Sequence, residues 1–322
     1  TIPVFGSNGQ VGVHNESAVD GPGIIVGRKG SVGEVKYCSR EFWPIDTTYY
    51  VVNPKGHRWR YLLHLLRHCG LTELNSHSAV PGLNREDVYN LEGWLPDPST
   101  QSQIANVLDF IERSGELERR AELLTASLKQ AVMGDLFSKG LRGEPQRESE
   151  LGPIPASWKL ARFSETREWL QYGTSTRCTS EPVGRPVLRI PNIKSGGVDA
   201  TDLKYCDLLE HETSKYQLEH GDLLFIRTNG VIDRLGSCAV YTGQPAGALF
   251  ASYLIRARPL PNLVPKFAAY FFGSERGTSL VAGSATPAAD GKYNLNTGTI
   301  DALSLPLPPT PEEQQEIVDV FD

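Results

Sequence analysis

The sequence predicts an α+β protein in which two similar β-containing domains are separated by a long α-helix of the coiled-coil type. Two observations predict this organisation. The middle of the chain is a long proline-free run with helical spacing of apolar residues, and the segments on either side of it resemble each other. A chain of 322 residues is also too long for one ordinary core, so two domains and a connector are expected.

The long helix is predicted over residues 98–141. The Pro-Ser-Thr opening at 98–100 offers Ser99 or Thr100 as the cap, and Gly140 is a typical stop. Apolar residues recur along this helix at alternating spacings of four and three residues, which predicts packing against another helix. The predicted pairing face consists of Ile104, Leu108, Ile111, Leu117, Leu124 and Leu128. Its phase slips by one residue near Gly115, where we expect a bend or a change of partner.

The remaining boundaries follow from composition and from the repeat. We expect a first domain over residues 1–97, a linker rich in charge, Gly and Pro over 142–157, a second domain over 158–308, and the start of a second, truncated helix over 309–322. The second domain has about thirty residues with no counterpart in the first. Part of the first domain is therefore expected to precede Thr1.

The internal repeat has a shift of about 212 residues, which pairs Leu83 with Leu295 and continues into a helix start on both sides. Further upstream, a buried-type strand ends at Arg28 in one copy and at Arg227 in the other. Each copy then has a second strand, near 49–52 and 251–256, and a short helix, over 58–69 and 265–272. The order of elements is therefore domain, helix, domain, helix.

Composition limits the class of protein. Hydrophobic residues make up 39% of the chain and charged residues 22%, and no apolar run could span a membrane. The five cysteines are scattered without a Cys-x-x-Cys pair, which indicates reduced thiols and a cytoplasmic location. A net charge of −6 argues against a protein that coats nucleic acid, yet residues 23–68 hold eight Lys/Arg against three Asp/Glu. Confined basic patches are expected.

Catalytic motifs are absent from the sequence. It contains no Asn-Pro-Pro-aromatic signature of adenine methylation, no Gly-rich phosphate loop ending in Lys-Ser/Thr, and no acids spaced for a nuclease metal site. His64 and His68 stand four residues apart on a short helix, but no third metal ligand has defined spacing, so we interpret them as part of a solvated basic face. We expect a non-catalytic chain that binds no cofactor or metal of its own.

Three stretches carry a family resemblance: Gly-Pro-Ile-Pro-Ala-Ser-Trp at 152–158, Gly-Asp-Leu-Leu-Phe-Ile-Arg at 221–227, and Leu-Pro-Pro-Thr-Pro-Glu-Glu-Gln-Gln-Glu-Ile at 307–317. In this order, with the repeat, they closely resemble the specificity subunit of type I restriction-modification enzymes. The resemblance implies two target recognition domains that each read half of a split DNA site. It also implies two helices that pair antiparallel as a spacer between the half-sites.

The resemblance implies partners as well. These are double-stranded DNA, two modification subunits that bind S-adenosylmethionine and methylate adenine, and restriction subunits that use ATP and Mg. No membrane is expected, and the exposed helix face predicts self-association. Two alternatives remain open: the recognition portion of a larger single-chain restriction-methylation enzyme, and a spacer that holds two protein-binding domains apart.

DNA reading requires polar and cationic side chains on loops of a rigid domain. The first-domain candidates are Ser7, Asn8, Arg28, Lys29, Ser31, Lys55, His57, Arg58 and His77. The second-domain candidates are Asn192, Lys194, Arg227, Thr228, Asn229, Arg234, Lys292, Tyr293 and Asn294. Arg28 and Arg227 occupy equivalent positions, where a guanidinium could fork onto guanine, bind a phosphate, or pair with an internal carboxylate.

Overall fold

The structure is a computed structural model that describes residues 1–53, 55–74, 82–194 and 196–322. The chain forms two compact units, Thr1–Glu122 and Leu123–Asp322. One long helix, α3 (Pro98–Lys139), contributes residues to both. Within the described ranges, no helix is long and apolar enough to cross a lipid bilayer.

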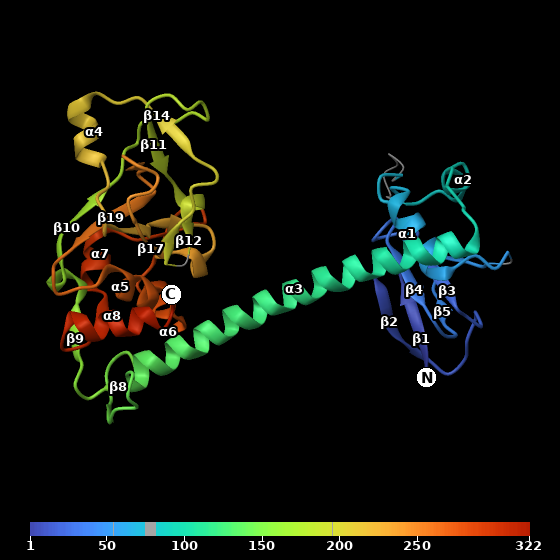
Figure 1. Cartoon of the computed structure of the whole chain (residues 1–322), viewed down its shortest axis with the longest axis horizontal. Coiled ribbons are helices and arrows are strands. Elements are labelled where there is room, and N and C mark those ends of the chain that lie inside the picture. The colour runs from blue at the N-terminus through green and yellow to red at the C-terminus, as the bar shows by residue number, and fades with distance from the viewer. Residues whose placement is uncertain (54, 75–81, 195) are drawn as a thin grey trace. The chain divides into compact units, whose positions relative to one another are not determined.

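The first unit consists of two small sheets, α1 (Trp59–His68), α2 (Arg85–Tyr89) and the first part of α3 (Figure 1). Its strands are β1 (Ile2–Gly6), β2 (Gly9–His14), β3 (Gly23–Gly27), β4 (Val35–Cys38), β5 (Trp43–Pro44) and β6 (Thr48–Val51). The strand orders are β2-β1-β5 and β4-β3-β6. All five residues of β3 are buried because this central strand has a hydrophobic cluster on each face.

The main core of the first unit joins β3 to α1. It contains Ile24 and Val26 of β3, Leu63 of α1, and Leu71. Gly33 brings the turn after β3 against this core in a left-handed conformation with φ +77°. A Cβ at that position would lie 2.4 Å from the Leu71 carbonyl, so only glycine permits the approach.

The second unit is larger. Its strands are β7 (Gln146–Arg147), β8 (Ile154–Pro155), β9 (Lys159–Arg162), β10 (Arg167–Tyr172), β11 (Arg185–Leu188), β12 (Ile193–Lys194), β13 (Gly197–Val198), β14 (Lys204–Cys206), β15 (Leu223–Ile226), β16 (Thr228–Asn229), β17 (Cys238–Val240), β18 (Leu249–Phe250), β19 (Leu254–Pro259), β20 (Thr286–Pro287), β21 (Tyr293–Asn294) and β22 (Ser304–Leu307). The helices are α4 (Glu210–Tyr216), α5 (Pro265–Gly273), α6 (Glu275–Gly283), α7 (Thr297–Ala302) and α8 (Pro311–Asp319), with 3-10 turns η1 (Phe163–Glu165), η2 (Ile190–Asn192) and η3 (Ile232–Arg234). The principal sheet has the order β10-β19-β15-β17. In Figure 1, α4 lies at one end of this unit and α8 at the other.

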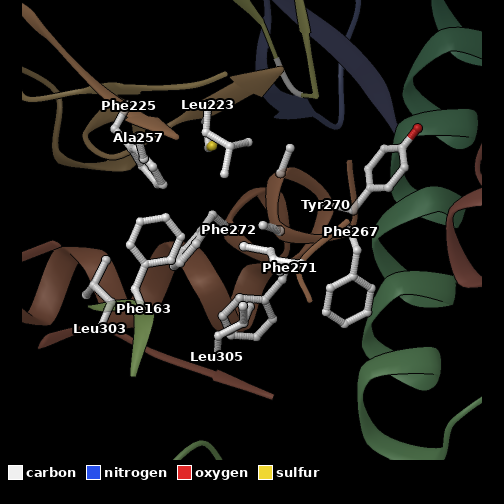
Figure 2. Packing of buried hydrophobic residues seen from close by; sticks show 14 of the residues in the cluster. Phe163, Leu223, Phe225, Ala257, Phe267, Tyr270, Phe271, Phe272, Leu303 and Leu305 are labelled. Atoms are coloured by element: carbon white, nitrogen blue, oxygen red, sulfur yellow. The ribbon is translucent and has the colours of Figure 1, made fainter. Parts of the chain in front are cut away.

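The core of the second unit is rich in aromatic side chains, as Figure 2 shows. Phe163, Phe225 and Phe272 form a triad with ring centroids 5.3–5.7 Å apart, in edge-to-face pairs. Such pairs contribute about 0.5–1.5 kcal/mol each beyond the burial of their area. The end of α3 belongs to this core, because Phe137 packs on Phe267 at 5.5 Å.

The two units share one plan, which confirms the predicted repeat. The strands β1, β2, β3, β4, β5 and β6 correspond in chain order to β11, β14, β15, β17, β18 and β19. β1 pairs antiparallel with β2 and parallel with β5, as β11 does with β14 and β18. β3 pairs antiparallel with β4 and β6, as β15 does with β17 and β19. The helices α1, α2 and α3 correspond to α5, α7 and α8.

The long helix α3 differs from the prediction at its start. The residue that caps the helix is Asp97, and not Ser99 or Thr100 as predicted. The Asp97 carboxylate accepts hydrogen bonds from the N–H groups of Ser99 and Thr100 at 2.9 and 3.2 Å. The hydrogen bond from the Thr100 hydroxyl, followed by those from the N–H groups of Thr100 and Ser99, lowers the pKa of Asp97. Proline at the first helical position requires no N–H partner, so the Asp-Pro pair begins the helix.

The predicted phase slip near Gly115 does not interrupt α3, which is helical throughout. Five of the exposed apolar residues, Val107, Phe110, Leu117, Leu124 and Leu128, form one line with steps of three, seven, seven and four. Ile111, which was predicted for the pairing face, and Leu123 are also exposed but lie off this line. Ile104 and Leu108 are half-buried and lie on the side of the buried Ala105. The predicted pairing face therefore combined two sides of the helix, and this combination produced the apparent slip. The exposed line, which we call the α3 stripe, consists of Val107, Phe110, Leu117, Leu124 and Leu128.

Candidate nucleic-acid interface

Two polar turns occupy equivalent places in the two units. Arg28 directly follows β3 and Arg227 directly follows β15. The Arg28 carbonyl accepts the N–H of Leu83 at 2.8 Å, and the Arg227 carbonyl accepts the N–H of Leu295 at 2.7 Å. Each turn is thus hydrogen-bonded to one member of the leucine pair, Leu83 and Leu295, that the repeat alignment matched.

In the second unit, a small polar sheet gathers several of the predicted residues. Thr228 and Asn229 form β16, which pairs with Asn294 and Tyr293 of β21 in the order β16-β21-β20. Lys292 stands in the turn before β21, where its ammonium pairs with Asp290 at 2.7 Å. Thr, Asn, Tyr and Lys side chains are among those that contact phosphates and base edges in protein–DNA complexes.

The side chain of Arg227 lies over the ring of Tyr172, with its guanidinium carbon 4.6 Å from the ring centroid. Its Nη1 donates to the Ser252 carbonyl at 3.5 Å, at the limit of a hydrogen bond. Among the described residues, no carboxylate lies within ion-pair distance of Arg227 or Arg28. In the part of the chain that is described, neither arginine is therefore paired with an internal carboxylate. The two remaining hypotheses are that each arginine binds a phosphate or that it binds a guanine.

In the first unit, the β1–β2 turn meets the turn after β3. The N–H of Ser31 donates to the Ser7 hydroxyl at 3.4 Å, which places Ser7 and its neighbour Asn8 beside Arg28 and Lys29. Five predicted residues, from two separate stretches of sequence, therefore lie together.

Arg28 shares an aromatic platform with an arginine that sequence reasoning missed. The guanidinium carbons of Arg28 and Arg85 lie 5.6 and 5.7 Å from the centroid of the Tyr49 ring. The Tyr49 hydroxyl donates to the Leu83 carbonyl at 3.1 Å, which fixes the ring. The repeat contained a signal for Arg85. The equivalent position in the second copy is Thr297, and positions that differ between the two copies are candidates for sequence-specific contacts.

Three predicted residues lie at another place in the first unit, near the start of α1. Main-chain groups of His57 exchange two hydrogen bonds with the Asn53 side chain, and the N–H of Arg58 is bound by Gln101 of α3. Lys55 precedes them in the same exposed loop. This second group is defined by Lys55, His57 and Arg58.

Four predictions have different outcomes. Asn192 is buried, and its amide bonds the N–H of Arg189 and the carbonyls of Asp199 and Asp202, so it serves the fold and leaves the candidate set. Lys194 is half-exposed and pairs with Asp199 at 3.6 Å. Arg234 is exposed in η3. His77 lies outside the described residues.

Two equivalent glutamines, also missed from sequence, attach α3 and α8 to their domains. Gln101 accepts the N–H of Arg58 at 2.9 Å and donates to the Pro96 carbonyl at 2.7 Å. Gln314 of α8 accepts the N–H of Val264 at 2.8 Å and donates to the Asn262 carbonyl at 3.0 Å. Both side chains are fully buried. The alignment of the two helix starts pairs these positions, so the repeat contained the signal.

His64 corrects the prediction of a solvated histidine face. It is buried, with Nε2 2.7 Å from Asp109 and Nδ1 3.6 Å from Glu112, while His68 is exposed. Arg60 binds Asp109 at 2.5 Å and Arg67 binds Glu112 at 2.8 Å. The Arg60 hydrogen bond, followed by the one from His64, lowers the pKa of Asp109.

His64, Asp109 and Glu112 place ligand-type atoms within 4.8 Å of one another. However, the two imidazole nitrogens face different carboxylates, and guanidinium groups already bind both of these acids. A metal ion needs ligand atoms that converge on one point. The group therefore acts as an ion-pair network that joins α1 to α3.

Two domains on one plan, each with a polar turn after a buried strand and a buried glutamine at the start of a helix, define a protein with two similar polar surfaces. The family model for the type I restriction modification DNA specificity domain matches residues 1–125 and 170–322. The chain belongs to this family. Its two matched regions contain the two sets of polar turns.

Individual relatives agree with the family. The chain is 30% identical over 237 residues to the type I restriction enzyme EcoKI specificity subunit of Escherichia coli K12, covering 72% of this chain and 50% of that protein. It is 28% identical over 180 residues to the putative MjaX specificity subunit of Methanocaldococcus jannaschii, covering 55% and 42%. The chain thus spans about half the length of the curated relatives it matches.

Solved structures support the fold. The S subunit of a type I restriction-modification system from M. genitalium has a TM-score of 0.62 at 15% identity, covering all of this chain and 82% of that one. A second structure, described as part of the type I R-M system, has a TM-score of 0.54 at 18% identity, covering 94% and 74%. At these identities the likeness concerns the fold alone.

Proposed function

We propose that this chain is the DNA-recognition component of a type I restriction-modification complex and reads a bipartite site. The observation that carries the proposal is the pair of equivalent polar turns, at Arg28 in one unit and Arg227 in the other. A protein that reads two half-sites requires two similar surfaces whose variable side chains differ. The turns meet this requirement, because Ser7, Lys29 and Arg85 surround one and Thr228, Asn229 and Tyr293 surround the other.

The chemistry of restriction and modification belongs to partners in this proposal. Two modification subunits supply S-adenosylmethionine and methylate adenine, and restriction subunits supply ATP and Mg, in the cytoplasm. The chain itself is non-catalytic, which the missing methylation, phosphate-loop and nuclease motifs support. The α3 stripe is the surface for a second helix of the spacer or for association with a partner.

Methylation-site mapping tests the proposal. Cells that carry the intact subunit with its modification subunits should methylate adenine within one split sequence. Arg227→Ala should alter methylation through one half of that sequence only. Methylation unaffected by deletion of the subunit would contradict the DNA-recognition role.

Titration with S-adenosylmethionine tests the non-catalytic assignment. The isolated chain should show no saturable heat on addition of S-adenosylmethionine or of ATP with Mg. A stoichiometric, tight isotherm for either cofactor would show that the chain carries part of the chemistry. DNA binding measured at graded salt separates the proposal from a spacer for protein partners, because only phosphate contacts give a steep salt dependence.

A further inference from the structure

Two of the five cysteines, Cys178 and Cys206, lie opposite each other in the second unit. The main chains of Thr179 and Tyr205 exchange two hydrogen bonds, each 2.9 Å long, and form an antiparallel bridge. The register of this bridge places Cys178 directly across from Cys206. A pair of residues beside such a doubly bonded pair is a non-hydrogen-bonded pair, whose Cα atoms are about 4.5 Å apart. Disulfides span Cα distances of roughly 4.4–6.8 Å, so the backbone register fits a disulfide.

The two cysteine side chains also share one face of the sheet. Cys206 belongs to a small apolar cluster with Val187, Leu249 and Ala251, and Cys178 packs against the same cluster. Cys206 is carried by β14, which pairs with β11 along its other edge (Figure 1). Among the described residues, which include all five cysteines, no disulfide is formed. The structure therefore shows the reduced state of a pair that has disulfide geometry.

The two thiols differ in their access to solvent. Cys206 is 3% exposed, whereas Cys178 is half-buried and its neighbours in the chain, 175–177 and 179–184, are exposed. The Cys178 thiol donates to the Thr176 carbonyl at 3.4 Å. A small oxidant in solution therefore meets Cys178 first, and Cys206 lies behind it as a second thiol.

We propose that Cys178 and Cys206 form a reversible redox site that hydrogen peroxide oxidises to a disulfide. The Cys178 sulfur attacks one peroxide oxygen, the O–O bond breaks, and a sulfenic acid and one water form. The Cys206 sulfur then attacks the Cys178 sulfur, the S–OH bond breaks, and the S–S bond forms with release of a second water. The two thiols give up two electrons and two protons, and the peroxide accepts both.

The first step prepares Cys206 for the second. Burial, followed by the negative charge and hydrogen bond of Cys178, raises the pKa of the Cys206 thiol to about 11. A sulfenic acid at Cys178 is neutral, so the contribution of its charge disappears. The Cys206 thiol therefore loses its proton more readily once its partner has become the electrophile.

The disulfide ties β14 to the segment 173–184, which connects β10 to β11. One end of this segment already lies against β14, because a Cβ on Gly184 would be 2.3 Å from the Cys206 carbonyl oxygen. The other end follows Tyr172, whose ring lies under the guanidinium of Arg227. Oxidation therefore restrains the segment next to one of the two polar turns. Formation of the disulfide itself does not depend on DNA binding.

Peptide mapping after oxidation tests the proposal. The full chain is treated with hydrogen peroxide, denatured, alkylated at its free thiols, digested and examined by mass spectrometry. The main disulfide should join Cys178 to Cys206, and dithiothreitol should restore both thiols. Cys69→Ser is the matched control, because Cys69 is also half-buried but lies in the first unit, and this variant should form the same disulfide. A disulfide between Cys178 and any other cysteine overturns the proposal.

Trapping of the intermediate tests the role of Cys206. In Cys206→Ser the sulfenic acid at Cys178 lacks its second thiol, so labelling of Cys178 by dimedone should rise by roughly tenfold over wild type. If this variant does not fold, the wild-type chain carries the test. Cys178 and Cys206 should then lose alkylation in equal amounts as peroxide is added. Conversion of Cys178 to sulfinic acid while Cys206 remains alkylated overturns the proposal, as does full alkylation of both.

Discussion

Replacing Leu117, Leu124 and Leu128 with Gln removes most of the apolar surface of the α3 stripe. These side chains are 67%, 61% and 64% exposed. Full burial of a leucine contributes roughly 1.5–3 kcal/mol, so covering the exposed two-thirds contributes roughly 1–2 kcal/mol each and roughly 3–6 kcal/mol for all three. Association through the stripe should therefore weaken by roughly two to four orders of magnitude.

Sedimentation velocity measures this effect, with the chain alone and with a modification subunit added. The matched control is Leu209→Gln, because Leu209 is 66% exposed in front of α4 and away from the stripe. The triple variant should lose self-association, or binding of the modification subunit, and the control should retain it. If wild type and triple variant have the same mass and the same partner binding, the stripe is not an interface and the proposed helix pairing is wrong.

Three further predictions concern charged residues. DNA-binding titrations of Arg28→Ala and Arg227→Ala distinguish two roles for each arginine. If the arginine binds a phosphate, the slope of log K against log salt should fall by about one unit. If it reads guanine, the binding free energy at one half-site should weaken by about 1–3 kcal/mol. The pKa of Asp109 is lowered in the folded chain, so its ionised carboxylate stabilises the folded state. This contribution to the free energy of unfolding is present above the unfolded pKa of 3.8 and is lost as pH falls through the lowered pKa. Unfolding free energies measured down through this range should show the loss, and Asp109→Asn should remove it. Asp222→Ala should cost about 3–5 kcal/mol in thermal or denaturant unfolding, because Arg256 would remain buried without its carboxylate; a cost below about 1 kcal/mol would contradict this reading.

The repeat made the two-unit plan of the fold predictable. Two segments that bury the same faces must repeat the same apolar spacing, so the match of Leu83 with Leu295 predicted that the two units have the same order of elements along the chain. The helices α1 and α5, the strands β3 and β15, and the long helix α3 were predicted near their observed positions, whereas α2, α4, α6 and α7 were not predicted. The cap at Asp97 was missed because Ser99 and Thr100 are also good caps, and only the position of Pro98 decides among them.

The site residues were less predictable because burial depends on distant segments. Asn192 looks like a surface loop residue, yet the carbonyls of Asp199 and Asp202 saturate its amide. His64 lies on the polar side of α1 by spacing, but Asp109 of α3 covers it. Arg85 contributes to the same platform as Arg28 only because both guanidinium groups reach the Tyr49 ring. Local sequence contains none of these contacts.

The twin glutamines have a consequence for how such proteins change over time. Gln314 hydrogen-bonds only main-chain atoms, and Gln101 bonds a main-chain N–H and a main-chain carbonyl besides its contact with the His57 ring. Main-chain atoms are present whatever the side chains are. The residues around each glutamine can therefore change without loss of these hydrogen bonds, whereas the ion pairs of Arg60, His64 and Arg67 with α3 tie the first unit to particular side chains. A joint of this kind tolerates substitution of side chains in the domain that it attaches.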